Sequence, residues 1–374
     1  MKEFNGIIRL KEKKNFENKR NYGIDLLRIY SMINILILHI NGCSGQLTLN
    51  INNKKFKSTW RLQAMSYFPV DCFGLISGIV GYKKYKFSNL IYIWINTSFY
   101  SSIFSLYLYC INRMTFKIMI ISFLPILTKR LWYISAYFIL YLFIPFLNFG
   151  INNLNKKIYR NLIIFFILFF SFYFIIGLSL SLRNDFVFLY EGYSSLWLII
   201  LYIIGGYLGK YNIINKNIIN LKYFIVYLLI YLFSAFISSE SFFFLIRIKS
   251  SIYNKSLLIN YLSPTIIFEA LSLLMIFSKL SINNKFIINI ILFFTPLTLN
   301  VTLLHSRLFF EKFITFNWMN KIKPNKICII IYVFGFILYI FCCLIDYLRS
   351  ILFKLLKIKQ LCLFIEDKFS KKFC

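Results

Sequence analysis

Long apolar runs separated by short basic clusters are the feature that most restricts how this chain can fold. Such runs recur along all 374 residues, and many have about the 20 residues that a helix needs to cross a bilayer. Mean hydropathy is +0.69 and hydrophobic residues make up 59%, more than a water-soluble domain keeps off its surface. The alternation of membrane β-barrels is absent. The sequence therefore predicts an all-α, polytopic membrane helix bundle.

Ten runs have spanning length and predict about ten transmembrane helices. They lie at 24–41, 62–82, 89–110, 131–149, 161–180, 194–209, 223–238, 256–278, 286–310 and 327–349. Two shorter stretches, 116–127 with its Pro125 and 241–246, are expected to be re-entrant or interfacial. The connections are too short for a soluble domain, so we expect a basic arm (1–23), a membrane bundle (24–349) and a basic tail (350–374).

The charge of the chain is strongly positive, with 43 Lys and Arg against 13 Asp and Glu. These basic residues flank apolar runs, which favours anionic lipid headgroups as partners, and no nucleic-acid-binding motif appears. Placing the N-terminus inside leaves more Lys and Arg in cytoplasmic than in outer loops, so both termini are expected in the cytoplasm. The eight cysteines form no CxxC pair, and we expect no bound metal or cofactor.

Arg28 and His39 are the most informative pair inside an apolar run. His39 is one of two histidines in the chain and lies eleven positions after Arg28. On a helix, eleven residues make three turns plus about 20°, so both side chains share one face, about 16 Å apart. Ionisable groups within a span are functional candidates because they are costly there. A snorkelling Arg28 and a structural hydrogen bond for His39 are the alternatives.

Other charged or titratable residues in the predicted spans are Asp25, Asp71, Glu269, His305 and Arg307. Asp25 lies one turn before Arg28 and can pair with it. Asp71 either caps the start of a helix or faces a substrate site. Glu269 is expected to pair with Arg307 or Lys279 and not to be catalytic.

Five blocks of sequence occur in an order that points to one family. They are GIDLLRIYSMINILILHINGCSG, FPVDCFGLISGIVGYKKYK, LWYISAYFILYLFIPFLN, GYSSLWLIILYIIGGYLGKY and TPLTLNVTLLHSRLF. These blocks resemble the first, second, fourth, sixth and ninth helices of the acyltransferase-3 family of integral membrane proteins, in which an Arg, ten residues and a His are a shared signature. The resemblance covers most of residues 22–310.

The resemblance implies a membrane-embedded O-acyltransferase of the surface-polysaccharide type. Such an enzyme moves an acetyl or similar short acyl group from cytoplasmic acyl-CoA, with acetyl-CoA as donor substrate, to a hydroxyl of a cell-surface or lipid-linked glycan. The expected catalytic residues are His39 and Arg28, supported by Asp25, Asp71 and His305. A neutral imidazole suits a general base near pH 7, and a transient acyl-histidine is the alternative.

Donor-binding candidates lie at the end of the second block. Where the family often has two arginines, this chain has Lys83, Lys84 and Lys86. Lysine keeps the charge but loses the bidentate fork. The predicted topology puts these lysines on the cytoplasmic side with Arg28, where the phosphates of coenzyme A would suit them. Ser77 and Gly78 either contact the donor or only let helices pack closely.

Acceptor-side candidates are Trp132 and Tyr133, which either form an interfacial aromatic belt or stack on a sugar. The ninth block lacks the tyrosine usual before the histidine, which weakens a catalytic role for His305 and favours packing. Two other functions are alternatives: a glycan flippase or transporter, and a polysaccharide polymerase. Neither an internal repeat nor a large outer loop supports them.

Overall fold

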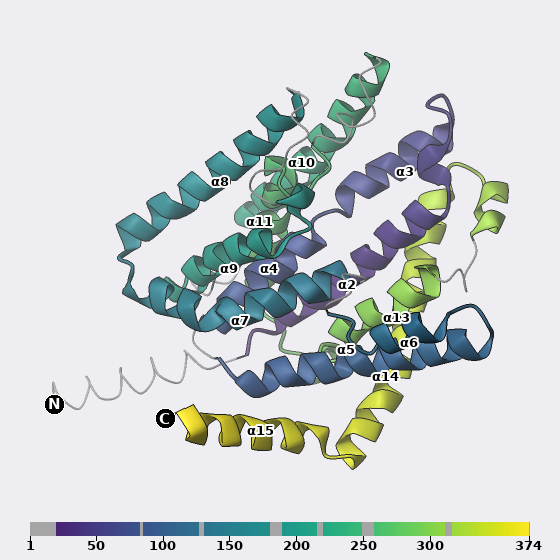
Figure 1. Ribbon diagram of the computed structural model, residues 1–374. Helices are drawn as coiled ribbons and strands as arrows, with labels where there is room; N and C mark the ends of the chain where they lie inside the picture. The colour runs from purple at the N-terminus through teal and green to yellow at the C-terminus, as the bar shows by residue number, and fades with distance from the viewer. Residues whose placement is uncertain are drawn as a thin grey trace.

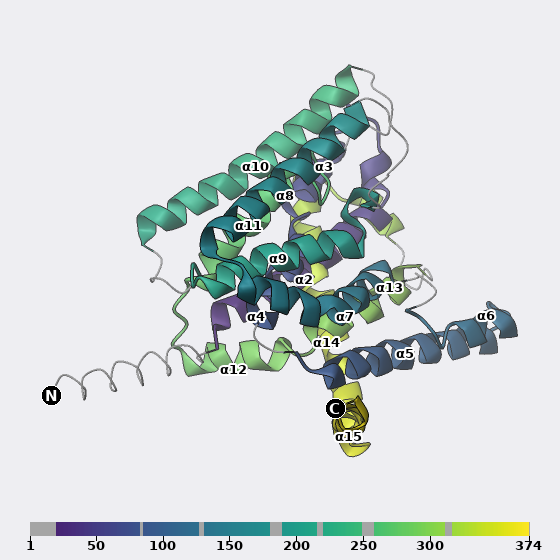
Figure 2. The same cartoon turned by 60° about the vertical axis from the view of Figure 1, so that its left-hand side comes forward.

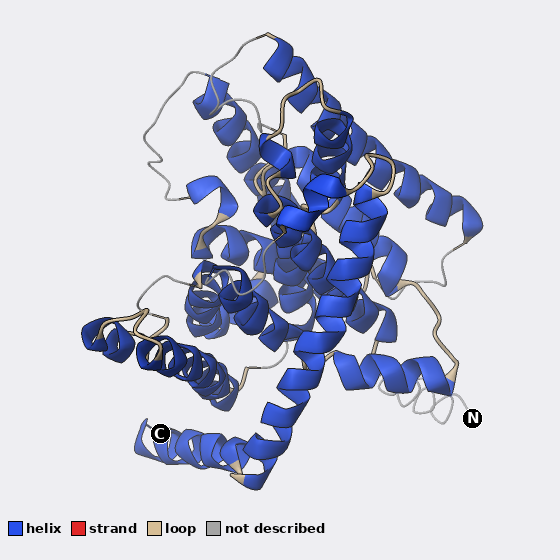
Figure 3. Cartoon of the chain, turned by 90° about the vertical axis from the view of Figure 1, so that its right-hand side faces the viewer, coloured by secondary structure: helices blue, strands red, loops and turns tan. Residues whose placement is uncertain are grey.

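The computed structural model describes residues 20–82, 85–126, 131–179, 189–214, 220–248, 258–310 and 316–373. Within these ranges the regular elements are helices, as Figure 3 shows. The helices are α2 (Tyr22–Cys43), α3 (Lys54–Met65), α4 (Pro69–Gly81), α5 (Phe87–Cys110), α6 (Phe116–Ile121), α7 (Trp132–Asn153), α8 (Lys156–Ser179), α9 (Ser195–Lys210), α10 (Leu221–Arg247), α11 (Pro264–Ser278), α12 (Lys285–Phe294), α13 (Thr298–Phe310), α14 (Ile327–Leu355) and α15 (Ile358–Phe373), with short 3₁₀ turns η1 (Gln46–Thr48), η2 (Tyr190–Gly192) and η4 (Asn317–Lys321). The predicted all-α fold is confirmed.

Helices lie in each of the ten predicted runs, but fewer have the length and composition of a span. In the described part of the chain, five segments do: α2, α3 with α4 (Lys54–Gly81), α7, α10 and α14. A sixth is added if α12 and α13, which are bent by 44° at their junction, count as one span. Several apolar helices make this a multi-pass membrane protein. The predicted number of ten spans is not confirmed.

α2 is the central helix of the bundle, and Figure 1 shows it in the middle, with other helices on both sides. It contacts α3, α4, α11, α12, α13 and α14. Its first half, with Ile24 and Leu27, packs in a core shared with α4 and α9. Its second half, with Met32 and Leu36, packs in a second core shared with α13 and α14. A side chain on α2 can therefore meet groups from both halves of the bundle.

Polar side chains fix both ends of α2. Asn21 caps the helix start by accepting from the backbone N–H of Ile24, and its side-chain amide donates to the carbonyl of Ser278 at the end of α11 (2.7 Å). Near the other end, Asn41 donates to the backbone oxygen of Thr59 and to Oε1 of Gln63, both at 2.9 Å. Buried polar groups satisfied in this way define one position for the helix.

Glycines let α4 and α9 approach closely. A Cβ at Gly78 would lie 2.0 Å from the carbonyl oxygen of Tyr202, and a Cβ at Gly205 would lie 2.0 Å from that of Leu75. No side chain fits at such distances, so the two backbones meet through small residues, as is common in membrane bundles. The position of Gly78 is thus explained by helix packing.

A buried ion pair joins α14 to two neighbouring helices. Arg349 and Asp346 pair at 2.6 Å, with side chains 5% and 0% exposed. Asp346 also accepts from the Tyr100 hydroxyl of α5 and the Asn300 amide of α13, and Arg349 donates to Asn96 of α5. A buried charge pair is tolerated when its remaining groups are also hydrogen-bonded. This network positions α13, which carries His305.

The interpretation of 241–246 as a separate interfacial stretch is wrong, because α10 continues without a break to Arg247. The hydroxyls of Ser239 and Ser241 donate to carbonyl oxygens three residues earlier, at 3.0 and 2.9 Å, so these polar residues cost the helix little. Glu240 pairs with Arg61 of α3 at 2.8 Å.

Two segments lie at the edge of the bundle. Residues 116–121 form the short helix α6 at the end of α5, which Figure 2 shows projecting to one side; its predicted interfacial location stays a prediction. The tail contains α15, which turns away from the end of α14 (Figure 3). α15 packs on α5, where the Glu366 carboxylate accepts from the backbone N–H of Phe87 at 2.7 Å.

Candidate active site

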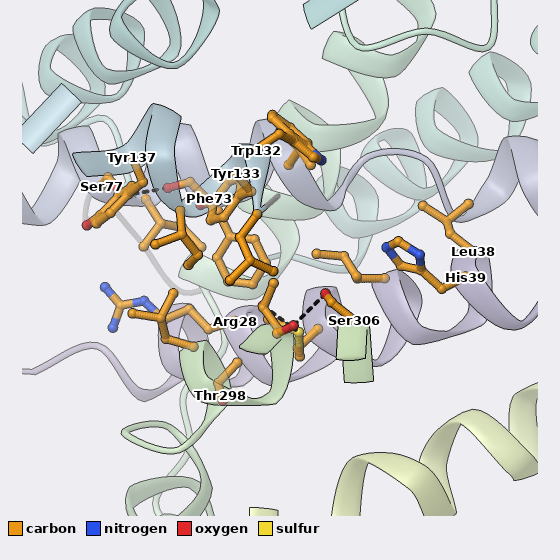
Figure 4. A pocket seen from close by; sticks show the side chains of 18 of the residues that line it. Arg28, Leu38, His39, Phe73, Ser77, Trp132, Tyr133, Tyr137, Thr298 and Ser306 are labelled. Carbon is orange, nitrogen blue, oxygen red and sulfur yellow. Dashed lines mark hydrogen bonds between the residues drawn. The ribbon is translucent and has the colours of Figure 1, made fainter. Parts of the chain in front are cut away.

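A cavity of about 660 Å³ lies between α2, α4, α7 and the α12–α13 pair. Figure 4 shows Arg28 at its left, His39 at its right, and Trp132 and Tyr133 above α2. Helix faces form much of its wall. The lining residues include Met32 and Ile35 from α2, Val70, Phe73, Ile76 and Ser77 from α4, Tyr137 from α7, and Thr298, Leu299, Thr302 and Ser306 from α13, besides those discussed below.

Arg28 and His39 both line this cavity, as their spacing on one helix predicts. Met32 and Ile35 lie between them on the same face, spaced three or four residues apart, as α-helical periodicity requires. The wall between the cation and the imidazole is therefore apolar. A long, thin substrate can contact Arg28 at one end and His39 at the other, about 16 Å further along the axis.

Asp25 holds two arginines beside the cavity. Its Oδ1 pairs with Arg28 at 2.8 Å and its Oδ2 pairs with Arg20 at 2.5 Å. The carboxylate is 4% exposed, whereas the side chains of Arg28 and Arg20 are 27% and 51% exposed. One anion between two cations leaves a net positive charge, and each guanidinium has more N–H donors than its bond to Asp25 uses. This end of the cavity suits an anionic group.

The two histidines of the chain meet at the other end. The ring centroids of His39 and His305 lie 4.9 Å apart. His305 is fully buried behind His39, outside the cavity lining. Its Nδ1 lies 2.7 Å from the carbonyl oxygen of Val301. Since a carbonyl oxygen only accepts, Nδ1 carries the hydrogen, and in the neutral ring Nε2 carries the lone pair. His305 is thus beside the principal candidate residue.

Aromatic side chains from several segments line a further part of the wall. Trp132 and Tyr133 begin α7, Tyr67 lies between α3 and α4, Tyr193 precedes α9, and Tyr261 precedes α11. The Tyr193 ring lies 4.6 Å from Trp132 and 5.0 Å from Tyr261. Both predicted residues, Trp132 and Tyr133, therefore face the cavity.

A strained turn presents Tyr193 to this wall. Tyr190, Glu191 and Gly192 all have positive φ, of 47°, 58° and 88°, and non-glycine residues in that region cost about 1–3 kcal/mol each. Gly192 is required there because a Cβ would lie 2.4 Å from the Cβ of Tyr261. Burial raises the pKa values of the Tyr193 and Tyr261 hydroxyls above the usual range. Both phenols therefore stay protonated and can donate hydrogen bonds.

The donor-binding candidates are only partly placed at the cavity. Ser77 lines it, and its hydroxyl donates to the carbonyl of Phe73 at 2.7 Å. Gly78 faces α9 and does not line the cavity. Lys86 is exposed at the start of α5, away from the lining. Lys83 and Lys84 lie outside the described residues.

Two buried carboxyl groups, Asp71 on α4 and Glu269 on α11, do not belong to the cavity lining. Asp71 is fully buried near the start of α4 and accepts from Trp197 Nε1 of α9 at 3.0 Å, so its bond links two helices and does not cap one. Glu269 is also fully buried, and neither of its oxygens has a hydrogen-bond partner among the described residues. Lys279, one predicted partner of Glu269, lies instead over the ring of Tyr227.

A family model described as an acyltransferase domain, that of the acyltransferase-3 family, matches residues 21–348. The chain belongs to this family. The match covers α2 to most of α14, and so includes every helix that lines the cavity. No curated protein and no solved structure gives a significant match. The protein is therefore a membrane acyltransferase.

Several cavity residues of this acyltransferase escaped the sequence analysis: Arg20, Gln63, Tyr67, Tyr193 and Tyr261. Arg20 stands in the basic arm, where it looked like one of many lipid-facing charges. The tyrosines are three among 27 in the chain, and nothing in their spacing distinguishes them. The positive-φ turn before Tyr193 contains one glycine, which is a weak signal.

Proposed function

We propose that this acyltransferase moves an acetyl or similar short acyl group from cytoplasmic acyl-CoA to a hydroxyl of a cell-surface or lipid-linked glycan. The observation that carries the proposal is the cavity itself, which has a cationic end at Arg28, an imidazole at His39 and an aromatic wall between helices. A thioester donor with an anionic head and a thin arm suits the cationic end and the imidazole. A hydroxylated acceptor suits the aromatic wall.

In direct transfer, His39 is the general base. Its imidazole takes the proton from the acceptor hydroxyl as the oxygen attacks the thioester carbonyl carbon, forming the C–O bond. The C–S bond then breaks, and the leaving thiolate takes the proton from the imidazolium. The products are the ester and free coenzyme A, with His39 neutral again.

In the alternative, His39 carries the acyl group. An imidazole nitrogen attacks the thioester carbon, and coenzyme A leaves as the thiol with the ring proton. The acceptor oxygen then attacks the acyl carbon, the C–N bond breaks, and the hydroxyl proton returns to the imidazole. This route lets donor and acceptor approach at different times. Rapid quenching with radiolabelled acetyl-CoA and no acceptor separates the two: label retained on the wild type but not on a His39 variant supports the acyl carrier.

The donor is proposed to enter at the Arg20–Asp25–Arg28 end, which precedes and begins α2. With both termini in the cytoplasm, this end faces the compartment that holds acyl-CoA. The phosphates of the donor meet the arginines, and the pantetheine arm extends past Met32 and Ile35 toward His39. Burial of the arm between apolar walls favours this orientation.

The proposal is tested by removing the protein from the cell that produces it. Ester-linked acyl groups on the surface glycan are expected to disappear, while the length and amount of the glycan stay the same. Complementation with the wild type restores the esters. Ester release by mild alkali, quantified against total sugar, measures the effect. Unchanged ester content contradicts the proposal, and a fall in glycan export or length with unchanged acylation per sugar favours the transporter or polymerase.

Replacing Arg28 by alanine is expected to raise the KM for acetyl-CoA about tenfold or more, because a hydrogen bond to a charged group contributes about 1.5–3 kcal/mol. Arg28→Lys should raise this KM less, since lysine keeps the charge without the planar fork. Initial rates of acetyl transfer in membranes give the KM of both variants. The KM for acetyl-pantetheine, which lacks the nucleotide phosphates, should not change.

Arg61→Ala is the matched control for Arg28, since Arg61 makes an ion pair of the same length with Glu240 and does not line the cavity. It should leave the KM for acetyl-CoA unchanged. If Arg28→Ala raises the KM for acetyl-pantetheine as much as that for acetyl-CoA, the arginine shapes the cavity and does not bind phosphate.

A further inference from the structure

A compact aromatic cluster, formed by Tyr67, Trp132, Tyr193 and Tyr261, lines the cavity. The Tyr67 and Tyr261 centroids are 4.7 Å apart, and the Tyr67 and Tyr193 hydroxyls are hydrogen-bonded at 2.9 Å. The four residues come from four segments that are far apart in the sequence. An interfacial aromatic belt would spread such side chains around the outside of the bundle, whereas here they converge on one cavity.

The aromatic cluster has both a buried base and an accessible face. Tyr261 is 5% exposed and packs against the rings of Tyr67 and Tyr193, while Tyr193 is 39% exposed. The hydroxyls of three tyrosines accompany the ring faces, so the surface is apolar in its faces and hydrogen-bonding at its edges. That combination matches a sugar ring, which presents C–H groups on its faces and hydroxyls around its edge. An acyl chain would use only the faces.

The chain holds Tyr193 firmly in this position. The turn η2 before it has three consecutive positive-φ residues, and Ser194 after it caps α9 by accepting from the Trp197 N–H at 3.2 Å. The backbone of Gly192 approaches Tyr261 too closely for any side chain. A strained turn that persists directly before a capped helix is a feature of ligand-binding sites.

We infer that the aromatic cluster is the subsite that binds the acceptor sugar ring, and that Tyr193 is a residue that determines acceptor affinity. This inference rests on the proposed function. It assigns binding of the acceptor to residues outside α2 and α13, the helices that carry the two histidines. The sugar stacks on the exposed face of Tyr193 and Trp132. Its hydroxyls exchange hydrogen bonds with the Tyr67–Tyr193 pair, and one hydroxyl is directed along the cavity toward His39.

The test uses the full chain in membranes, tritiated acetyl-CoA, and surface glycan from the producing cell from which esters have been removed. Tyr193→Ala is expected to raise the KM for this glycan roughly two- to tenfold, the usual range for loss of an aromatic contact. Tyr193→Phe keeps the ring and should raise it less. The KM for acetyl-CoA at saturating glycan should stay as in the wild type, because the donor is proposed to bind at the Arg28 end of the cavity.

Tyr223→Ala is the matched control, since Tyr223 is an exposed tyrosine (57%) on α10, outside the cavity lining. It should leave the KM for glycan unchanged. An unchanged glycan KM in Tyr193→Ala, with a wild type that acylates the glycan, overturns the subsite and leaves the proposed function standing. An equal rise in the KM for acetyl-CoA also overturns it, because it indicates a general structural role. A wild type that acylates no glycan overturns both proposals.

Discussion

Replacing His39 by alanine is expected to reduce acyl transfer about 10²–10⁴-fold, the usual contribution of a positioned acid–base group. Both routes for the acyl group require an imidazole nitrogen at this place, so both lose their central step. His39 lines the cavity, so the truncation opens space without exposing a buried charge. The rate of ester formation on the glycan is measured for the wild type and the variant at matched levels of membrane-inserted protein, and the ratio of the two rates tests the prediction.

His39→Gln tests the alternative that this side chain only makes an interhelical hydrogen bond. Glutamine keeps a donor and an acceptor but cannot take up a proton or carry an acyl group. We expect it to be as inactive as the alanine variant. Activity near the wild-type level in His39→Gln would remove His39 from the chemistry. Added imidazole should partly restore transfer in His39→Ala, because the vacated space adjoins the cavity.

Periodicity explains which parts of the site were predictable. Arg28 and His39 lie on one helix, where the spacing along the chain fixes their relative direction, and the structure places both at the same cavity. Asp25 was likewise predicted to pair with Arg28, and it does, at 2.8 Å. Local geometry within α2 decides each of these contacts.

Contacts between helices were less predictable because they depend on packing. Nothing in the sequence showed that His305 would lie 4.9 Å from His39, or that four aromatic residues from separate segments would converge. Gly78 illustrates the ambiguity: a small residue serves a ligand or a neighbouring backbone equally well, and only the approach of Tyr202 decides between them. Arg20 reaches Asp25 from outside the predicted span.

The number of spans shows a different limit. Hydropathy located helices in all ten apolar runs, but α9 and α11 are shorter than a bilayer requires. Their apolar character follows from burial inside the bundle, since residues such as Leu198, Leu201 and Ala270 are fully buried. A window of hydropathy does not distinguish a helix buried by protein from one surrounded by lipid. The fold class was therefore predictable and the exact topology was not.

Replacing His305 by asparagine or phenylalanine is expected to lower kcat about a hundredfold, the effect of misplacing a catalytic group by about 1 Å. The carbonyl of Val301 holds Nδ1 at 2.7 Å as the donor, so Nε2 can accept from an N–H group. We expect Nε2 of His305 to fix the orientation and tautomer of the neighbouring His39 ring, as a third group does in catalytic triads. His305 would thus be a positioning residue. The KM for acetyl-CoA should change little.

Two amide variants separate this role from simple packing. The side-chain amide of His305→Asn reaches roughly the place of Nδ1, and that of His305→Gln reaches roughly the place of Nε2. If His305 acts through Nε2, the glutamine variant should keep clearly more activity than the asparagine variant. His305→Phe keeps the ring but no nitrogen and should be as slow as the asparagine variant. Full activity in His305→Phe, at the thermal stability of the wild type in detergent, would show that the ring only fills space.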